Sequence, residues 1–232
     1  MDRPRSLTAG PVSRQALPVS DGNTDSVSTA SSEHLSGGLV LLGGASGSGK
    51  SYLARTYGRP HLLLDAFYRE ISEDQKGDPQ RSFPRTAYGE IDWDHPGTWN
   101  ARAAVDAIIE LRETGRTRVP DYSITTSSIT GYVDLELAGG PIVAEGIFAA
   151  ELPRILSRLG VDFQAWYIDQ HRLTTAARRL ARDLAERRKP VPFLIQRGWS
   201  LLRKEREIRD HYLDAGFTPV PKAELHRRLA AR

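Results

Sequence analysis

The feature that most restricts the fold of this chain is a glycine-rich stretch, Gly44-Ala45-Ser46-Gly47-Ser48-Gly49-Lys50-Ser51, which fits G-x-x-x-x-G-K-[ST]. It follows the apolar run Gly38–Gly43, which is bounded by glycines and typical of a buried strand, and precedes a helix that we predict from Lys50 to about Tyr57. In that context the loop's backbone N–H groups converge on phosphate oxygens, and the helix dipole adds to the attraction. An ordinary Gly/Ser-rich loop could give the same string by chance, but the flanking strand and helix favour a phosphate-binding loop.

The same motif predicts individual contacts with a nucleotide. Lys50 is expected to reach the β- and γ-phosphates, and the Ser51 hydroxyl is expected to ligate magnesium. We include the next residue, Tyr52, in the nucleotide site because it continues the first helical turn. ATP and Mg²⁺ are therefore the expected ligands.

The remaining folded sequence alternates short apolar runs with helical periodicity. Further strands are predicted at residues 61–64, 142–144 and 163–168, and helices at 99–114, 148–159, 173–188 and 193–212. This alternation indicates an α/β protein whose mostly parallel sheet carries helices on both faces. Residues 1–36 are rich in Ser, Thr, Gly, Pro and Asp, and we predict that they form a disordered tail before a single domain over 37–232.

Acidic residues follow three of the predicted strands. They are Asp65, Glu145 and Asp169. Ligands of open parallel sheets bind beyond the carboxyl ends of the strands. A magnesium and phosphate site is therefore expected at this edge of the sheet.

Composition excludes several classes of function. The chain has no cysteine, so a disulfide framework, a thiolate metal site and a thiol nucleophile are all impossible. Its 32 Lys and Arg residues barely outnumber its 29 Asp and Glu residues, which argues against a dedicated nucleic-acid binder. No stretch approaches the length of an apolar membrane span, and the N-terminus lacks a secretory signal. We expect a cytoplasmic protein with no membrane partner.

Further motifs follow the phosphate loop in a fixed order: Leu64–Arg69 with Asp-Ala-Phe-Tyr, Ile91–Pro96 with Asp-His-Pro, Val119–Tyr122 after a short strand, Ala144–Ile147 with Glu-Gly, and the arginine-rich Arg178–Arg187. Together they resemble the uridine-cytidine kinase family, a relative of phosphoribulokinase and bacterial pantothenate kinase. The resemblance extends over roughly Leu39–Tyr212. It implies a three-layer P-loop kinase fold with an Arg-rich helical lid over about 171–192.

The resemblance also implies roles on the acceptor side of the site. Asp65 is similar to the general base on a nucleoside 5′-hydroxyl, and Tyr68 to a nucleoside-pocket residue. Asp94 resembles the residue that holds the ribose hydroxyls, and Tyr122 resembles a base-contacting aromatic. The residues themselves leave two alternatives for Asp65, because an Asp at this point can cap a turn or serve purely as a magnesium ligand.

On the phosphate side, the resemblance implies that Glu145 helps to hold magnesium beside Ser51 and Asp65. Lid arginines Arg179, Arg182 and Arg187 would close over the phosphates, with Arg182 catalytic and Arg179 also near the substrate. Their i, i+4 spacing to acidic residues also fits a solvated, salt-bridged helix. The like-charge pair Arg178 and Arg182 favours an anion nearby.

Two departures from the family pattern leave the acceptor open. Ile124 and Ser127 stand where the family has an aromatic residue and a base-reading His. We therefore expect a kinase for a small alcohol, with a nucleoside as the first candidate and a pantothenate-like or sugar acceptor as the alternative. A regulatory P-loop NTPase is a third hypothesis. The apolar stretch 192–206 could pack on the core or on a second subunit, so a homo-oligomer is also an open expectation.

Overall fold

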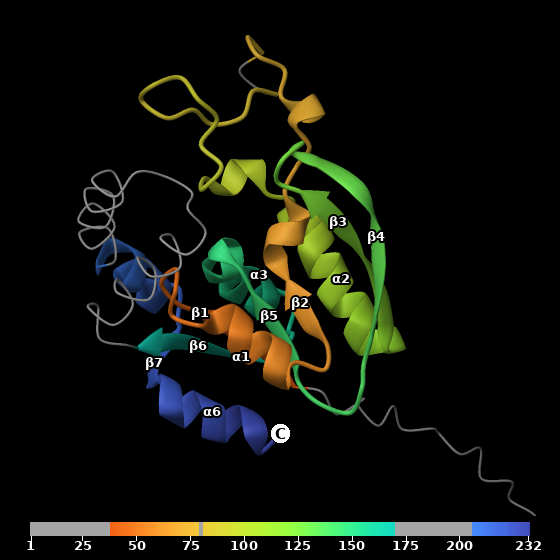
Figure 1. Ribbon diagram of the computed structural model, residues 1–232, viewed down its shortest axis with the longest axis vertical. Coiled ribbons are helices and arrows are strands. Elements are labelled where there is room, and N and C mark those ends of the chain that lie inside the picture. The colour runs from red at the N-terminus through yellow and green to blue at the C-terminus, as the bar shows by residue number, and fades with distance from the viewer. Residues whose placement is uncertain (1–37, 79–80, 170–205) are drawn as a thin grey trace, which may run out of the picture. The chain divides into compact units, whose positions relative to one another are not determined.

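The computed structural model describes residues 38–78, 81–169 and 206–232. Its central sheet has five strands in the order β2-β5-β1-β6-β7 (Figure 1). Their bounds are β1 Leu39–Gly43, β2 His61–Leu63, β5 Ile142–Glu145, β6 Phe163–Asp169 and β7 Thr218–Pro221. Every pairing within this sheet is parallel, which confirms the predicted sheet type.

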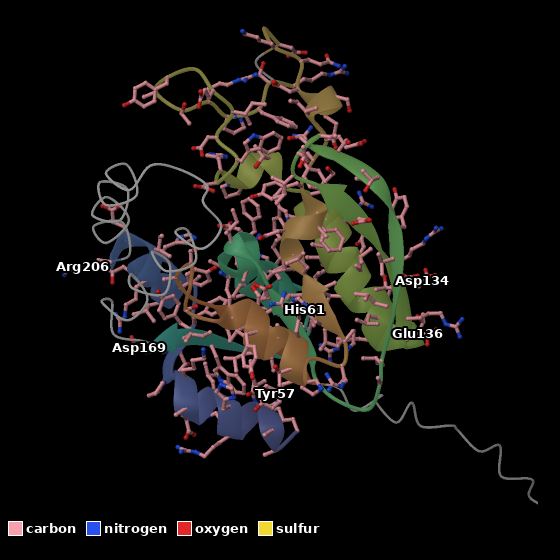
Figure 2. All side chains as sticks on the ribbon, viewed as in Figure 1. Tyr57, His61, Asp134, Glu136, Asp169 and Arg206 are labelled. Carbon is pink, nitrogen blue, oxygen red and sulfur yellow. The ribbon has the colours of Figure 1, made fainter. Side chains whose placement is uncertain are left out.

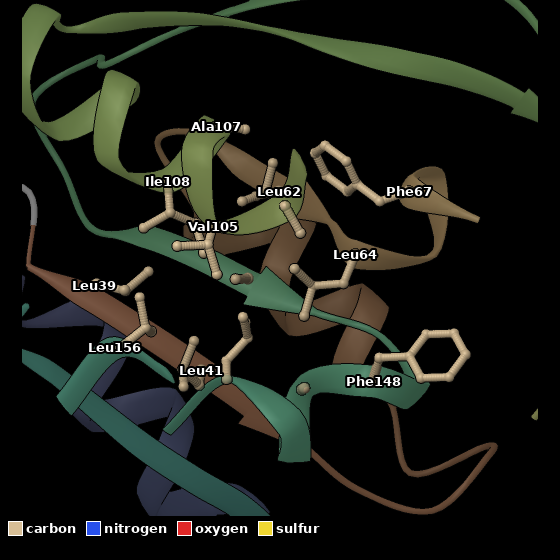
Figure 3. Close-up of a cluster of buried hydrophobic side chains, with 14 of the residues drawn as sticks. Leu39, Leu41, Leu62, Leu64, Phe67, Val105, Ala107, Ile108, Phe148 and Leu156 are labelled. Atoms are coloured by element: carbon tan, nitrogen blue, oxygen red, sulfur yellow. The ribbon is translucent and has the colours of Figure 1, made fainter. Parts of the chain in front are cut away.

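Both faces of the sheet are covered, as the continuous apolar character of β1 predicts. Leu39 and Leu41 point into one core cluster with residues of α2 (Ala101–Thr114) and α3 (Leu152–Arg158). Figure 3 shows side chains of this cluster, among them Leu39, Leu41 and Ile108. Val40 and Leu42 point into the other cluster, with residues of α1 (Lys50–Tyr57) and α6 (Lys222–Ala230). The three-layer arrangement is thereby confirmed.

Most predicted helices occur close to their expected bounds. Helix α1 spans the predicted residues, and α2 begins two residues later than predicted because the Asn100 side chain caps it by accepting from the Ala103 amide. The predicted helix 148–159 is divided into a 3-10 helix, η4 (Ile147–Glu151), and α3, with Pro153 in the first turn of α3. Residues 206–214 are helical and lie at the end of the predicted helix 193–212, whereas the predicted helix 173–188 lies outside the described residues.

An antiparallel hairpin is the main departure from the sequence prediction. It consists of β3 (Arg116–Ser123) and β4 (Ser128–Glu136), which pair only with each other. The motif Val119–Tyr122 lies inside β3, so its predicted position after a short strand was wrong. Pro120, which cannot donate a ladder hydrogen bond, concealed this strand. The C-terminal β7 and α6 were also not predicted.

Short 3-10 helices connect the sheet to this hairpin. They are η1 (Leu64–Phe67), η2 (Ile71–Glu73) and η3 (Pro96–Thr98). The imidazole Nδ1 of His95 accepts from the Gly97 amide at 3.0 Å and so caps η3. Among the described helices, none has the length and apolar character needed to cross a bilayer.

Candidate active site

The glycine-rich loop joins the end of β1 to the start of α1. Its backbone is tight: a Cβ on Gly44 would lie 2.6 Å from Ser48 Oγ, and the Ser48 amide donates to Ala45 O at 3.0 Å. Gly49 has φ 96°, a left-handed conformation that favours glycine. The loop borders an open hollow of about 320 Å³, lined by Ser46, Gly47, Gly49, Lys50, Ser51, Tyr52 and Arg55.

Two observations show that this loop suits an anion. Ser48 Oγ is buried yet has no hydrogen-bond partner among the described residues, and buried polar atoms rarely remain unpaired. Helix α1 has no side-chain cap on its first-turn amides and no acidic residue in that turn. Uncapped amides at a helix N-terminus attract phosphate oxygens. The loop residues therefore fit a nucleotide polyphosphate.

Glu145 ends β5 next to this loop and is almost fully buried, with 2% of its surface exposed. Its Oε1 lies 3.3 Å from His61 Nε2, and its carboxylate also accepts from the Ser51 hydroxyl. Burial alone would raise the pKa of Glu145, but these two hydrogen bonds and the Lys50 charge outweigh it and lower the pKa. Glu145 is therefore ionised at neutral pH and lies beside both Ser51 and Lys50.

Asp65 lies in η1, directly after β2, the strand that neighbours β5. Its Oδ1 accepts from the Ile147 amide at 3.0 Å, and a Cβ on Gly146 would come within 2.5 Å of the same oxygen. Burial is the main cause that raises the pKa of Asp65, and the charges of Glu145 and Asp94 raise it further. The Ile147 hydrogen bond and the Lys50 ammonium lower it only in part. Asp65 thus lies within electrostatic reach of Lys50, as its predicted role requires.

Backbone contacts fix the position of this carboxyl group. The indole N–H of Trp99 donates to the Leu64 carbonyl at 2.9 Å, immediately before Asp65. The Tyr212 hydroxyl donates to the Gly146 carbonyl at 3.1 Å, immediately before Ile147. Both rings are buried. The Asp65 carboxyl is therefore held between two anchored backbone segments.

Aromatic rings gather beside Asp65 on the acceptor side. The Tyr68 ring lies 5.5 Å from Tyr122, 5.7 Å from Trp93 and 5.3 Å from Phe148, measured between centroids. Burial raises the pKa of Tyr68, and the nearby charges of Asp65 and Asp94 raise it further. Asp94 itself is exposed. The structure thus brings the predicted residues Asp65, Tyr68, Asp94 and Tyr122 to one region.

The tip of the hairpin is attached to this region by hydrogen bonds. The Tyr122 hydroxyl donates to the Arg69 carbonyl at 3.2 Å, and the Ile71 amide donates to the Ser127 carbonyl at 2.8 Å. The Ser127 side chain is hydrogen-bonded to Tyr122, while Ile124 is 82% exposed. Ser127 thus bonds to Tyr122 of the same chain, at the position where the uridine-cytidine kinase pattern has a base-reading His.

Two residues near the loop were not predicted. His61 was read only as part of a strand, and its proximity to Glu145 depends on the pairing of β2 with β5, which the sequence does not reveal. Lys222 begins α6, and its ammonium lies against Gly49 of the loop and 5.9 Å from the Tyr52 ring centroid. In the sequence, Lys222 is simply a basic residue after the segment Thr-Pro-Val-Pro, which does not indicate a place beside the loop.

The predicted lid and tail fall outside the described part of the chain. The lid arginines Arg179, Arg182 and Arg187 lie outside the described residues, as does the tail 1–36. Within the described ranges, no group of three or more His, Cys, Asp or Glu side chains has a metal-holding arrangement. Magnesium is commonly held by one or two carboxylates together with substrate phosphates and water. The pair Ser51 and Glu145 fits this mode of binding.

Comparisons with known proteins identify relatives of this chain. A uridine kinase of Saccharomyces cerevisiae is 29% identical over 179 residues, which is 74% of this chain and 34% of the yeast protein. The uridine-cytidine kinase-like 1 protein of Mus musculus is 26% identical over 164 residues, which is 68% of this chain and 28% of the mouse protein. The chain thus spans about a third of the length of the curated relatives it matches.

A solved structure supports the fold. The protein described as a fructose transport system kinase from Silicibacter sp. TM1040 has a TM-score of 0.51 at 17% identity, covering 75% of this chain and 85% of its own. At this identity the likeness concerns the fold alone. The comparison with protein families shows more than the fold. Residues 39–196, well over half of the chain, match the model of the Phosphoribulokinase / Uridine kinase family. The chain belongs to the phosphoribulokinase / uridine kinase family.

Proposed function

We propose that this chain is a kinase that transfers the terminal phosphoryl group of ATP, with Mg²⁺, to a hydroxyl of a small molecule, with a nucleoside 5′-hydroxyl as the first candidate. One observation carries the proposal. Two carboxylates on neighbouring strand ends, Asp65 and Glu145, both interact with the charge of Lys50 beside an anion-binding loop. Phosphoryl transfer needs positioning and charge neutralisation more than covalent chemistry, and this arrangement supplies both.

The two carboxylates have different proposed tasks because their pKa values are shifted in opposite directions. The lowered pKa of Glu145 keeps it ionised, as a magnesium ligand beside the Ser51 hydroxyl must be. The raised pKa of Asp65 makes it a better proton acceptor for an alcohol than an ordinary Asp would be. Lys50 would bind the β- and γ-phosphates. Bound ATP and Mg²⁺ supply the transferable group and the additional positive charge.

The charges around the acceptor side favour an uncharged polyhydroxyl substrate. Tyr68 interacts with the charges of Asp65 and Asp94. An anionic alcohol such as pantothenate would be repelled by these two carboxylates, whereas Glu73 near Tyr122 is ion-paired with Arg69. A nucleoside fits better, since its ribose hydroxyls can donate to Asp94 and its base can lie against aromatic rings.

Nucleosides come first among such substrates because uridine kinases are the sequence relatives. The base remains unassigned in this proposal, since Ser127 is bonded to Tyr122 and Ile124 is exposed. A site that lacks hydrogen-bonding partners for one base discriminates weakly against the others. A small sugar is the second candidate, because it presents the same hydroxyl chemistry to Asp65 and Asp94.

Measurement of ADP release across nucleosides, pantothenate and small sugars tests the proposal. We expect turnover that depends on both Mg²⁺ and an acceptor and that is fastest with a nucleoside. Lys50→Ala, which removes the phosphate-binding amine, serves as the inactive control. Acceptor-independent ATP hydrolysis would favour a regulatory NTPase, and the fastest turnover with pantothenate would refute the electrostatic argument.

A further inference from the structure

The unpredicted His61 lies on β2, the edge strand of the sheet, where Figure 2 labels it. In the register of the parallel pair, His61 is opposite Val143 and Leu63 is opposite Glu145. His61, Val143 and Glu145 therefore lie on the same face of the sheet, the face against which α1 packs. The imidazole Nε2 reaches Glu145 Oε1 at 3.3 Å, with 21% of the His61 side chain exposed.

The direction of this hydrogen bond follows from the state of Glu145. A glutamate side chain is ordinarily ionised at neutral pH, and an ionised carboxylate can only accept a hydrogen bond. His61 Nε2 therefore carries the hydrogen and donates it. With 2% of its surface exposed, Glu145 depends on protein donors to satisfy its oxygens.

Two donors thus hold Glu145 from different elements. The Ser51 hydroxyl comes from the first turn of α1, and the His61 ring comes from β2. A carboxylate with a single partner can rotate about its side-chain torsions, whereas two partners from separate elements restrict that rotation. The Ser51 oxygen, whose hydrogen points to Glu145, then keeps its lone pairs available on the other side.

We propose that His61 is a positioning residue that holds the Glu145 carboxylate beside the Ser51 hydroxyl and so presets the magnesium site. This inference rests on the proposed function, in which Ser51 and Glu145 bind the metal. Residues that orient metal ligands without contacting the metal typically change metal affinity by 10–100-fold when they are replaced. The competing explanation is that His61 only fills space and satisfies a buried carboxylate.

Three substitutions separate these explanations. His61→Gln keeps an N–H donor near the Nε2 position, His61→Asn keeps a polar side chain too short to reach Glu145, and His61→Leu keeps bulk without a donor. The chain also offers a matched control, since His211 Nε2 lies 3.5 Å from Glu151 Oε1 in an exposed pair. His211→Leu removes a His–Glu pair that plays no part in the site.

The decisive measurement is the dissociation constant of Mn²⁺, read from the electron paramagnetic resonance signal of free Mn²⁺, with a non-hydrolysable ATP analogue and no acceptor present. We expect His61→Leu and His61→Asn to weaken Mn²⁺ binding by about 10–100-fold. His61→Gln and His211→Leu should remain close to the unsubstituted protein. Binding of the ATP analogue in the presence of EDTA should be equal in all variants.

Each other outcome has a defined meaning. Unchanged Mn²⁺ affinity in both His61→Leu and His61→Asn would overturn the inference and leave the proposed kinase function standing. Equal losses in His61→Gln and His61→Leu would also overturn it, because the ring volume and not the donor would then matter. If the unsubstituted protein bound the nucleotide without binding Mn²⁺, the proposed function and this inference would fail together.

Discussion

The phosphate side and the acceptor side of the site are built differently. On the phosphate side, the loop, α1 and the end of β5 present backbone amides and buried side chains, with Ser48 and Glu145 exposed by 1% and 2%. The acceptor side consists of the described residues of segments 68–78 and 81–95 and of the β3–β4 hairpin, where Tyr88 and Ile124 are exposed by 93% and 82%. Asp65 lies at the border between them.

This difference separates general chemistry from specificity. Backbone amides stay the same when side chains change, so those of the loop suit a ligand as invariant as a triphosphate. A site made of rings and loop side chains changes whenever those residues change. Substitutions at the border should therefore affect turnover, and substitutions in the acceptor side should affect acceptor affinity alone.

The largest effect is expected for Asp65→Asn. Loss of the proton-accepting carboxylate should lower kcat by about 10²–10⁴-fold, because general-base catalysis contributes effects of that size. The Kd for ATP, measured by isothermal titration calorimetry, should stay unchanged, since the phosphate loop is untouched. Normal turnover in this variant would show that Asp65 is not the base.

A smaller effect is expected for Gly146→Ala. The added Cβ would lie 2.5 Å from Asp65 Oδ1 and 2.9 Å from Leu64 Cβ, so the carboxyl must shift. Displacement by about 1 Å can reduce turnover by about 10²-fold, which steady-state kinetics would detect. Gly131→Ala is the matched control, because nothing lies within 4 Å of its added Cβ. Equal kcat values in the two variants would contradict the importance of the close approach.

Tyr122→Phe tests the acceptor side. This change removes the hydroxyl that donates to the Arg69 carbonyl and keeps the ring beside Tyr68. A lost hydrogen bond of about 1 kcal/mol corresponds to a rise of about fivefold in the KM for the acceptor. The KM for ATP should not change. A comparable rise in both KM values would mean that the two sides are not independent.

The smallest effect concerns stability and pH. The pKa of Asp65 is raised in the folded protein, so ionisation of this carboxyl destabilises the folded state. This destabilisation is absent at a pH below the pKa of the unfolded state and complete at a pH above the pKa of the folded state. Asp65→Asn removes that destabilisation. Its Tm should exceed that of the unsubstituted protein at neutral pH, and the difference should shrink as the pH falls. A lower Tm at pH 7 would indicate that the charged carboxylate stabilises the fold.

The two sides also differ in how far the sequence predicts them. The bounds of β1 and α1 follow from an apolar run, glycines and Lys50, all of which lie within a few residues of one another. The hairpin was missed because Pro120, a residue unfavourable in strands, lies within β3, and β7 was missed because prolines occupy two of its four positions. Strand order depends on contacts between distant segments. For that reason the approach of His61 to Glu145 could not be predicted, although Asp65 and Glu145 themselves were.

The adjacency of β2 and β5 has a consequence for how new binding sites can arise on this fold. The chain leaves the sheet at Leu63 and returns at Ile142 on the neighbouring strand, and the stretch between them carries Tyr68, Asp94 and the whole hairpin. One continuous stretch between two adjacent strands thus holds the acceptor-facing parts together with Asp65 and the core helix α2. Recombination or grafting of that single segment offers a route to a new substrate while the nucleotide machinery is inherited intact.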